Sequence, residues 1–278
     1  MQITNSGKTT IVDFFGVSDM LELIKTTNIT NHSRDNTSSF VDFSGGTWEG
    51  MINQSTYGNM ELVNQMSDKL DNLMLEFTAE SSEDIKDVYG DYFCVSEFLS
   101  GEPEHFRRSD TGRGRRAIVD ITVNLGMNCW IDNDTIKNRG CVAVALYNAL
   151  KASGAIVNIS LTDISLYKGK KYIININIPT NPVDLDEFSF VVANPLCHRR
   201  AMFAVLEHLT GMSNCESYGE PIDIVPDEGV DNLCIYFSSS NYSEFDKNEK
   251  LYDTELGSTE LFITIINRIE HGERLIVV

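Results

Sequence analysis

The alternation of strand-like and helix-like segments from residue 117 to residue 278 constrains the fold of this chain more than any other feature. Short runs of apolar and β-branched residues predict strands over 117–123, 156–166, 171–178, 188–193, 233–237 and 274–278. Apolar residues spaced three and four apart predict helices over 134–154, 195–209 and 256–269. Because a parallel crossover needs a helix-length connection, this order predicts a doubly wound α/β domain, with a mostly parallel sheet and helices on both faces.

One connection in this pattern is too short for a parallel crossover. Only Tyr167–Lys170 separates the second predicted strand from the third. A glycine in so short a loop is typical of a β-hairpin, so these two strands are expected to be antiparallel and to form an antiparallel edge of the sheet. Open parallel sheets bind ligands beyond the carboxyl ends of their strands, which makes the end of the strand over 117–123 the first place to look for a site.

Three residues mark expected helix ends. Asp134 is expected to cap the helix over 134–154, because Asp accepts hydrogen bonds from the free N–H groups at a helix start. Pro195 suits the first turn of the next helix. Gly211 is expected to end that helix, because glycine adopts the left-handed backbone conformation of a helix terminus without strain.

The first 116 residues lack this alternation of strand-like and helix-like segments. They are polar and irregular, with a run rich in Ser, Thr and Asn over 28–39 and one helical pattern over 59–77. The Ser6–Thr9 segment (SGKT) lacks the upstream glycine of a phosphate-binding loop, so we expect a flexible terminus there. The chain is therefore divided into an irregular N-terminal region, residues 1–116, and an α/β domain, residues 117–278. The first region either forms a domain of its own or wraps the sheet.

Charge and cysteine usage narrow the classes of partner. The chain has 22 Lys and Arg against 41 Asp and Glu, and this net charge of −19 opposes nonspecific attraction to nucleic acid and to anionic membranes. No apolar stretch approaches the length of a membrane span. The six cysteines form no C-x-x-C pair and stand mostly in apolar runs, which predicts buried free thiols in a reducing compartment. We expect a cytoplasmic protein without membrane partners.

The sequence contains no recognisable catalytic motif. It has no nucleophile elbow, no dinucleotide-binding glycine motif after a strand and no zinc-protease motif. Cys197 and His198 are adjacent, but neighbours on a helix point in different directions, so we expect a core thiol beside a surface histidine. The five histidines also lack zinc-ligand spacing. The sequence therefore predicts a non-enzymatic binding protein without a cofactor, unless it binds a magnesium ion.

Five arginines stand close together just before the α/β domain. They are Arg107, Arg108, Arg113, Arg115 and Arg116, with glycines at 112 and 114 between them. Glycine lets a backbone approach phosphate closely, and a guanidinium group can hold two phosphate oxygens at once. This arginine segment is the candidate site for single-stranded nucleic acid or a phosphate-rich partner. The alternative is that it forms ion pairs with this protein's own acidic residues or with an acidic partner chain.

Polar side chains recur at every second position in the first strand of the α/β domain. Asp120, Thr122 and Asn124 face the same direction on an extended chain, and their oxygen atoms suit a hard cation such as Mg²⁺. These three residues are the candidate metal ligands. The alternative is that Asp120 caps a loop at the end of the strand.

The same three residues carry a family resemblance. Asp120 and Thr122 match the start of a D-x-S-x-S motif, with Asn124 in place of the second serine. This run resembles the motif of von Willebrand factor A domains, and the order of elements over 117–278 is similar to that family as well. The resemblance implies a von Willebrand A-like protein interaction module with a vestigial metal site.

Short motifs are spread over most of the chain. They are Gly46–Gly50 (GTWEG), Thr56–Asn59 (TYGN), Asn138–Leu146 (NRGCVAVAL), and Ala193–Pro195 (ANP) followed by His198–Arg200 (HRR). Together they resemble an uncharacterised domain family of tailed bacteriophages. The resemblance implies a phage protein made in the host cytoplasm. By analogy with small single-stranded-DNA-binding accessory proteins, it implies a factor for phage transcription or replication, with single-stranded nucleic acid or a phage protein such as an RNA polymerase as partner. A virion component is the remaining alternative.

Overall fold

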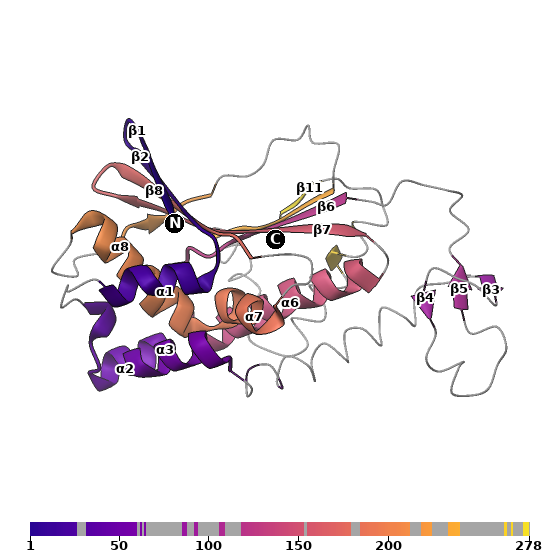
Figure 1. Cartoon of the computed structure of the whole chain (residues 1–278), viewed down its shortest axis with the longest axis horizontal. Helices are drawn as coiled ribbons and strands as arrows, with labels where there is room; N and C mark the ends of the chain where they lie inside the picture. The colour runs from indigo at the N-terminus through magenta and orange to yellow at the C-terminus, as the bar shows by residue number, and fades with distance from the viewer. Residues whose placement is uncertain are drawn as a thin grey trace.

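The computed structural model describes residues 1–26, 32–59, 118–152, 155–178, 184–211, 218–223 and 233–239. Shorter described pieces are 62, 64, 85–87, 92–93, 106–108, 264–265, 268 and 275–277. In this part of the chain, an eight-stranded sheet and a set of helices share one large buried core (Figure 1).

The sheet is mixed, and most of its long pairings are parallel. Its strands, in spatial order, are β1 (Gln2–Ser6), β2 (Thr9–Phe14), β8 (Lys170–Ile176), β7 (Ile156–Tyr167), β6 (Ile118–Asn124), β10 (Leu233–Phe237) and β11 (Leu275–Val277). The short strand β9 (Glu220–Pro221) pairs with β7 outside this row. The pairs β2–β8, β6–β7, β6–β10 and β10–β11 are parallel, whereas β1–β2, β7–β8 and β7–β9 are antiparallel. The predicted α/β class, with a mostly parallel sheet and an antiparallel pair, is confirmed.

The predicted hairpin lies inside the sheet. β7 and β8 are joined at Lys168 and Gly169, whose φ angles of 48° and 73° are left-handed, as a two-residue hairpin turn requires. β2 pairs in parallel with the other side of β8, so the strand at this edge is β1. The expected position of the hairpin at the edge was wrong, because strands from the N-terminal region extend the sheet beyond it.

Two strands of the sheet come from the first 14 residues. β1 and β2 form a hairpin around Gly7, which has a left-handed φ of 59°. The Ser6–Thr9 segment is therefore the turn of a hairpin and not a flexible terminus. Residues 2–14 belong to the same sheet as β6, while the division of the chain at residue 116 stays a prediction.

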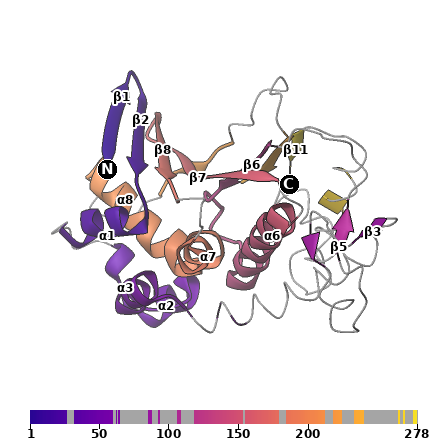
Figure 2. The ribbon, with the colours of Figure 1, turned by 45° about the vertical axis from the view of Figure 1, so that its right-hand side comes forward.

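The labelled helices lie on the same side of the sheet in Figure 1 and in Figure 2. They are α1 (Val17–Thr26), α2 (Ser38–Ser44), α3 (Trp48–Tyr57), α6 (Asn133–Ala152), α7 (Leu185–Ala193) and α8 (Met202–Thr210). The residues of β6 explain this arrangement. Val119, Ile121 and Val123 are buried while Asp120 and Thr122 are partly exposed, so the strand has one apolar face. The sequence predicted helices on both faces, and the labelled helices cover one of them.

The predicted strand over 188–193 is a helix. This run lies in α7, and its side chains are all buried. α7 begins after Asp184, whose carboxylate accepts hydrogen bonds from the N–H groups of Asp186 and Glu187 at 3.0 and 3.1 Å. A helix segment buried on all sides has no polar stripe, so its sequence lacks the periodicity that would distinguish it from a buried strand.

Other helix ends lie close to their predicted positions. A backbone N–H in the first turn of α6 donates to Asp132 at 2.6 Å, so Asp132 and not the expected Asp134 caps this helix. Gly211 ends α8 with a left-handed φ of 66°, as predicted. Most residues of the helices predicted over 59–77 and 256–269 lie outside the described part of the chain.

A glycine sets the distance between α6 and α7. A Cβ atom on Gly140 would lie 2.3 Å from the Cβ of Ala193 and 2.6 Å from the carbonyl oxygen of Val192. Helices separated by ordinary side chains lie 8–10 Å apart between their axes, and a residue without a side chain permits a closer approach. The two helices therefore pack tightly beneath the sheet at this position.

Candidate ligand-binding pocket

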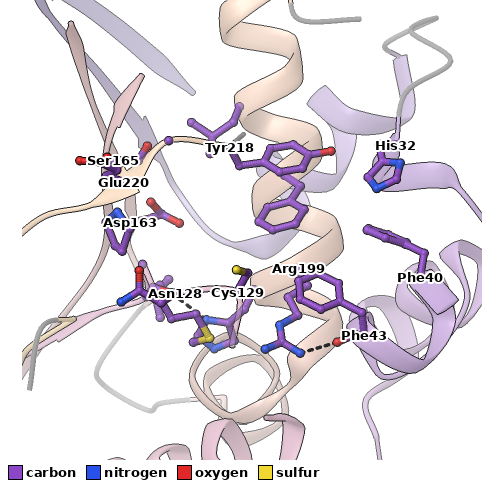
Figure 3. A pocket seen from close by; sticks show the side chains of 18 residues that line it. His32, Phe40, Phe43, Asn128, Cys129, Asp163, Ser165, Arg199, Tyr218 and Glu220 are labelled. Atoms are coloured by element: carbon purple, nitrogen blue, oxygen red, sulfur yellow. Dashed lines mark hydrogen bonds between the residues drawn. The ribbon is translucent and has the colours of Figure 1, made fainter. Parts of the chain in front are cut away.

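A cavity opens where β7 runs past the end of β6. β7 has 12 residues and β6 has 7, and their last paired residues are Asn124 of β6 and Thr162 of β7. β7 continues without a β6 neighbour, and β9 pairs there with Ser165 and Leu166 instead. This corner holds a cavity of about 460 Å³ (Figure 3). The cavity begins one residue after Asn124, at the carboxyl end of the strand where a parallel sheet is expected to bind ligands.

One side of the cavity is a row of rings, called the aromatic wall from here on: His32, Phe40, Phe43, Phe203 and Tyr218. Successive ring centroids lie 4.5, 5.6, 6.4 and 3.7 Å apart, in that order. Contacts of this kind stabilise by about 0.5–1.5 kcal/mol each beyond the area they bury. The rings come from the turn before α2, from α2, from α8 and from the segment before β9, so only the tertiary fold brings them together.

The opposite side carries two buried polar groups of β7. Asp163 and Ser165 are 6% and 5% exposed, and side chains two residues apart point to the same face of a strand. The Ser165 hydroxyl has no hydrogen-bond partner among the described residues, and none of those residues donates a hydrogen bond to the Asp163 carboxylate. Burial raises the pKa of Asp163 to about 7. Glu220 of β9 adds a second carboxylate beside them (Figure 3).

The residues between α7 and α8 hold the loop that follows β6. They form a wide π-turn over Cys197–Ala201, a feature frequent at functional sites. Within it, Nδ1 of His198 lies 3.0 Å from the carbonyl oxygen of Leu125, and Nε2 lies 3.3 Å from that of Val192. Burial lowers the pKa of His198 to about 4, so the imidazole is neutral at pH 7. His198 is 4% exposed, and the expected surface histidine was wrong.

The described cysteines are free and differ in exposure. Cys197 is fully buried, which confirms the predicted core thiol, and burial raises its pKa, so that the thiol stays protonated. Cys141 and Cys234 are buried as predicted. Cys129 is exposed and lines the cavity, so the expectation of a buried thiol was wrong at that position. Cys94 and Cys215 lie outside the described residues.

Arg199 anchors the aromatic wall to the start of α6. Its guanidinium carbon lies 4.2 Å from the ring centroid of Phe43. The group donates hydrogen bonds to the backbone carbonyls of Phe43 and Ile131, and at 2.9 Å to the side-chain oxygen of Asn133. Because Nη1 and Nη2 hold the backbone of Phe43 beside the start of α6, this arginine has a positioning role in the wall.

Arg200 anchors the same wall from behind α2. It is fully buried, and its guanidinium carbon lies 4.8 Å from the ring centroid of Phe40. Its Nε donates to the hydroxyl of Ser44 at 2.9 Å and to the carbonyl oxygen of Gly46 at 2.7 Å, and Nη1 donates to the carbonyl oxygen of Ser33 at 2.9 Å. The GTWEG and HRR motifs, far apart in the sequence, therefore meet through this side chain.

The three candidate metal ligands lie along one strand. Asp120 and Asn124 are four residues apart in β6, a separation of about 13 Å in an extended strand. Oδ1 of Asp120 accepts a hydrogen bond from Asn158 at 2.7 Å. Asn124 donates to Asp223 at 2.9 Å and accepts from the N–H of Gly126 at 3.0 Å. No group of three His, Cys, Asp or Glu that could hold a metal is found in the described part of the chain, and the magnesium site with Thr122 stays a prediction.

Part of the arginine segment lies in a second, small sheet. β5 (Phe106–Arg108) pairs antiparallel with both β3 (Ile85–Asp87) and β4 (Tyr92–Phe93). The backbone of Arg107 and Arg108 is thus the middle strand of three. Arg113, Arg115 and Arg116 lie outside the described residues.

None of the residues on the acidic side of the cavity was predicted from the sequence, although β7 carries a signal for them. Val157, Ile159 and Leu161 are the buried residues of its alternating part, and the same alternation then reaches Asp163 and Ser165. A polar residue on the buried face of a strand is costly unless it is paired, so such a break indicates a site. The aromatic wall has no comparable signal, because its rings come from separate segments.

Comparison with known proteins identifies the family of the chain. Residues 2–265 match the family described as "Domain of unknown function (DUF7192)". The chain therefore belongs to this family. No curated protein and no solved structure matches it. No helix in the described part of the chain has the length and apolar character that crossing a membrane requires.

Proposed function

We propose that this protein is a non-catalytic binding protein and that its small-molecule site is the cavity at the end of β6. The observation that carries the proposal is the pair Asp163 and Ser165, which are buried, line the cavity and have no hydrogen-bond partner in the described part of the chain. A buried polar group without a partner costs about 1–3 kcal/mol. Such groups in a folded protein call for an explanation, and a ligand that uses them is one.

The composition of the cavity supports the same proposal. Small-molecule sites are concave and mostly apolar, with a few placed polar groups that fix the orientation of the ligand. Here the aromatic wall and Leu206 supply the apolar surface, while Asp163, Ser165 and Glu220 supply the polar groups. The volume of about 460 Å³ lies within the range of known ligand pockets, about 300–1,000 Å³.

The side chain of Arg139 lies at the carboxyl ends of β6 and β10, on the side of β6 away from β7. Its guanidinium donates hydrogen bonds to the carbonyl oxygens of Asn124, Phe237 and Ser238 at 2.9, 3.0 and 3.3 Å. These carbonyls lie at the carboxyl ends of β6 and β10, where an open sheet often binds its ligand. The arginine thus occupies the ends of these two strands, whereas the cavity lies on the β7 side of β6.

The protonation states favour binding over nucleophilic catalysis. The thiol of Cys197 is protonated, and a protonated thiol is a poor nucleophile. Both ring nitrogens of His198 face backbone carbonyls, so the imidazole is not positioned as a base for that thiol.

A fragment screen with a cavity-filling variant tests the proposal. Asn128 is half-buried and lines the cavity, so Asn128→Trp places a large side chain where a ligand would lie. Glu22→Trp, at an exposed position of α1, is the matched control. Ligand-observed NMR should show fragments that bind the wild-type protein and the control but not Asn128→Trp. Fragments that bind all three proteins equally would refute the assignment of the site.

The hypotheses from family resemblance remain proposals beside this one. They are a phage-encoded factor in the host cytoplasm that binds single-stranded nucleic acid or a phage protein through the arginine segment, and a von Willebrand A-like interaction module. The central position of Arg107 and Arg108 in a three-stranded sheet supports a defined backbone for that segment.

A further inference from the structure

We infer that the cavity binds an organic cation, whose ammonium, amidinium or guanidinium group lies against Asp163 and Ser165 and whose apolar part lies along the aromatic wall. The inference rests on the proposed function, because it requires the cavity to be a ligand site. It adds the chemical class of the ligand.

The polar groups on the β7 side of the cavity can accept hydrogen bonds from a ligand. An ionised carboxylate only accepts hydrogen bonds, and both Asp163 and Glu220 line the cavity. The hydroxyl of Ser165 can accept as well. Nη1 and Nη2 of the Arg199 guanidinium donate to protein acceptors, and the ring nitrogens of His198 face carbonyl oxygens. A cationic group placed against Asp163 and Ser165 would supply donors to these acceptors, whereas an anion placed there would meet two carboxylates.

The aromatic wall suits the same class of ligand. A cation placed over an aromatic face is attracted by the ring quadrupole, by about 0.5–2 kcal/mol depending on desolvation. The wall already has this property toward the protein, since Arg199 lies over Phe43 and Arg200 lies over Phe40. The apolar part of the ligand can also cover ring surface that lines the cavity, which removes apolar surface from water.

The buried carboxylate of Asp163 also favours a cationic ligand. Asp163 is 6% exposed, and no opposite charge offsets its desolvation within the described part of the chain. A cationic ligand would provide that missing charge, whereas a neutral ligand would leave the carboxylate unpaired. Binding of a cation should therefore favour the ionised form of Asp163 and release a proton near neutral pH, since its pKa in the free protein is about 7.

Several other titratable or charged groups face the cavity or lie close to Asp163. They are His32, Cys129, Cys197, His198, Arg199, Tyr218 and Glu220. Their presence makes variants of Asp163 the necessary control for any pH dependence.

Benzamidine and benzamide are suitable probes, because they have nearly the same shape and differ in charge. Isothermal titration calorimetry should show that the wild-type protein binds benzamidine at least tenfold more tightly than benzamide at pH 8. Benzamidine should bind about tenfold more weakly at pH 6 than at pH 8, because one proton with a pKa near 7 must leave on binding. Asp163→Asn should lose at least tenfold in benzamidine affinity and lose this pH dependence.

Two variants keep the test decisive. Asp120→Asn, on the opposite face of the sheet, should bind benzamidine like the wild type. Ser165→Ala, a smaller change at the same end of the cavity, should weaken benzamidine binding even if Asp163→Asn fails to fold. Equal affinity for benzamidine and benzamide, both lost in Asn128→Trp, would overturn the cationic class and leave the pocket as a ligand site. Absence of benzamidine binding to the wild type at millimolar concentration would also overturn the inference. The proposed function fails separately, if Asn128→Trp changes the binding of no fragment.

Discussion

Replacement of Asp163 by asparagine should stabilise this protein at neutral pH, and the gain should disappear in acid. Asp163 is buried, and burial raises its pKa from 3.8 to about 7 in the folded protein. Between these two values the folded state holds a proton that the unfolded state has lost, so stability falls as the pH rises through this window. The loss is complete above pH 7, where the carboxylate is ionised in both states.

The magnitude follows from the size of the shift. A difference of roughly 3 pKa units corresponds to about 4 kcal/mol, an upper bound because local opening and water relieve part of the burial. Asparagine has nearly the same shape and carries no charge, so Asp163→Asn should be more stable than the wild type by about 2–4 kcal/mol at pH 8. At pH 4 the two proteins should differ by less than about 1 kcal/mol, since the wild-type carboxyl is then protonated as well.

Urea denaturation at a series of pH values between 4 and 8 measures this difference. Asp120→Asn, which removes a carboxylate from the opposite face of the same sheet, is the matched control. A gain for Asp163→Asn that is independent of pH, or an equal gain in the control, would refute the reasoning from burial. A variant that is more stable yet binds cations less well would be typical of a site that gives up stability for function.

Four further outcomes can be checked. Gly140→Ala should destabilise the protein by about 1–3 kcal/mol in the same denaturation assay, because the added Cβ would lie 2.3 Å from that of Ala193; a neutral effect would contradict the close packing of α6 and α7. Cys129 should react fastest with a thiol reagent among the described cysteines, and benzamidine should slow the reaction, with Cys129→Ser as the control. In a gel-shift assay, the affinity for single-stranded DNA should fall when the five arginines over 107–116 are replaced by alanine; an unchanged affinity would show that the arginine segment does not bind the DNA. Millimolar Mg²⁺ should raise the melting temperature of the wild type but not of Asp120→Ala if the metal site exists, and no shift in either protein would reject it.

Much of the secondary structure could be predicted because its causes are local. The hairpin at Lys168 and Gly169 follows from residues that tolerate a left-handed backbone, and Gly211 ends α8 for the same reason. The alternation in β6 was also visible, but its polar half was interpreted as a set of metal ligands, and the prediction of helices on both faces left it out of account. Phe188–Ala193 was predicted as a strand and is a helix. Its residues are buried on every side, so the sequence shows neither the helical nor the strand period of polar residues.

Only the position of the candidate site was predicted from the sequence, and its residues were not. The carboxyl end of β6 is where a parallel sheet is expected to bind ligands, and the cavity begins there. Its acidic residues could have been found from the polar break at Asp163 and Ser165 in β7. The candidates chosen instead, Asp120 and the arginine segment, rested on residue type, which does not show what lies beside a residue in space.

The sequence by itself determined the α/β class, the antiparallel pair and several helix ends, because hydrogen bonding and backbone preference act over a few residues. Only the tertiary structure decided that the first 14 residues extend the sheet, since β2 pairs with β8 more than 150 residues away. Likewise, the different lengths of β6 and β7 open a space that neither strand specifies alone. The aromatic wall and the acidic residues of β7 meet across that space because distant apolar surfaces pack together, a driving force that has no direction along the chain.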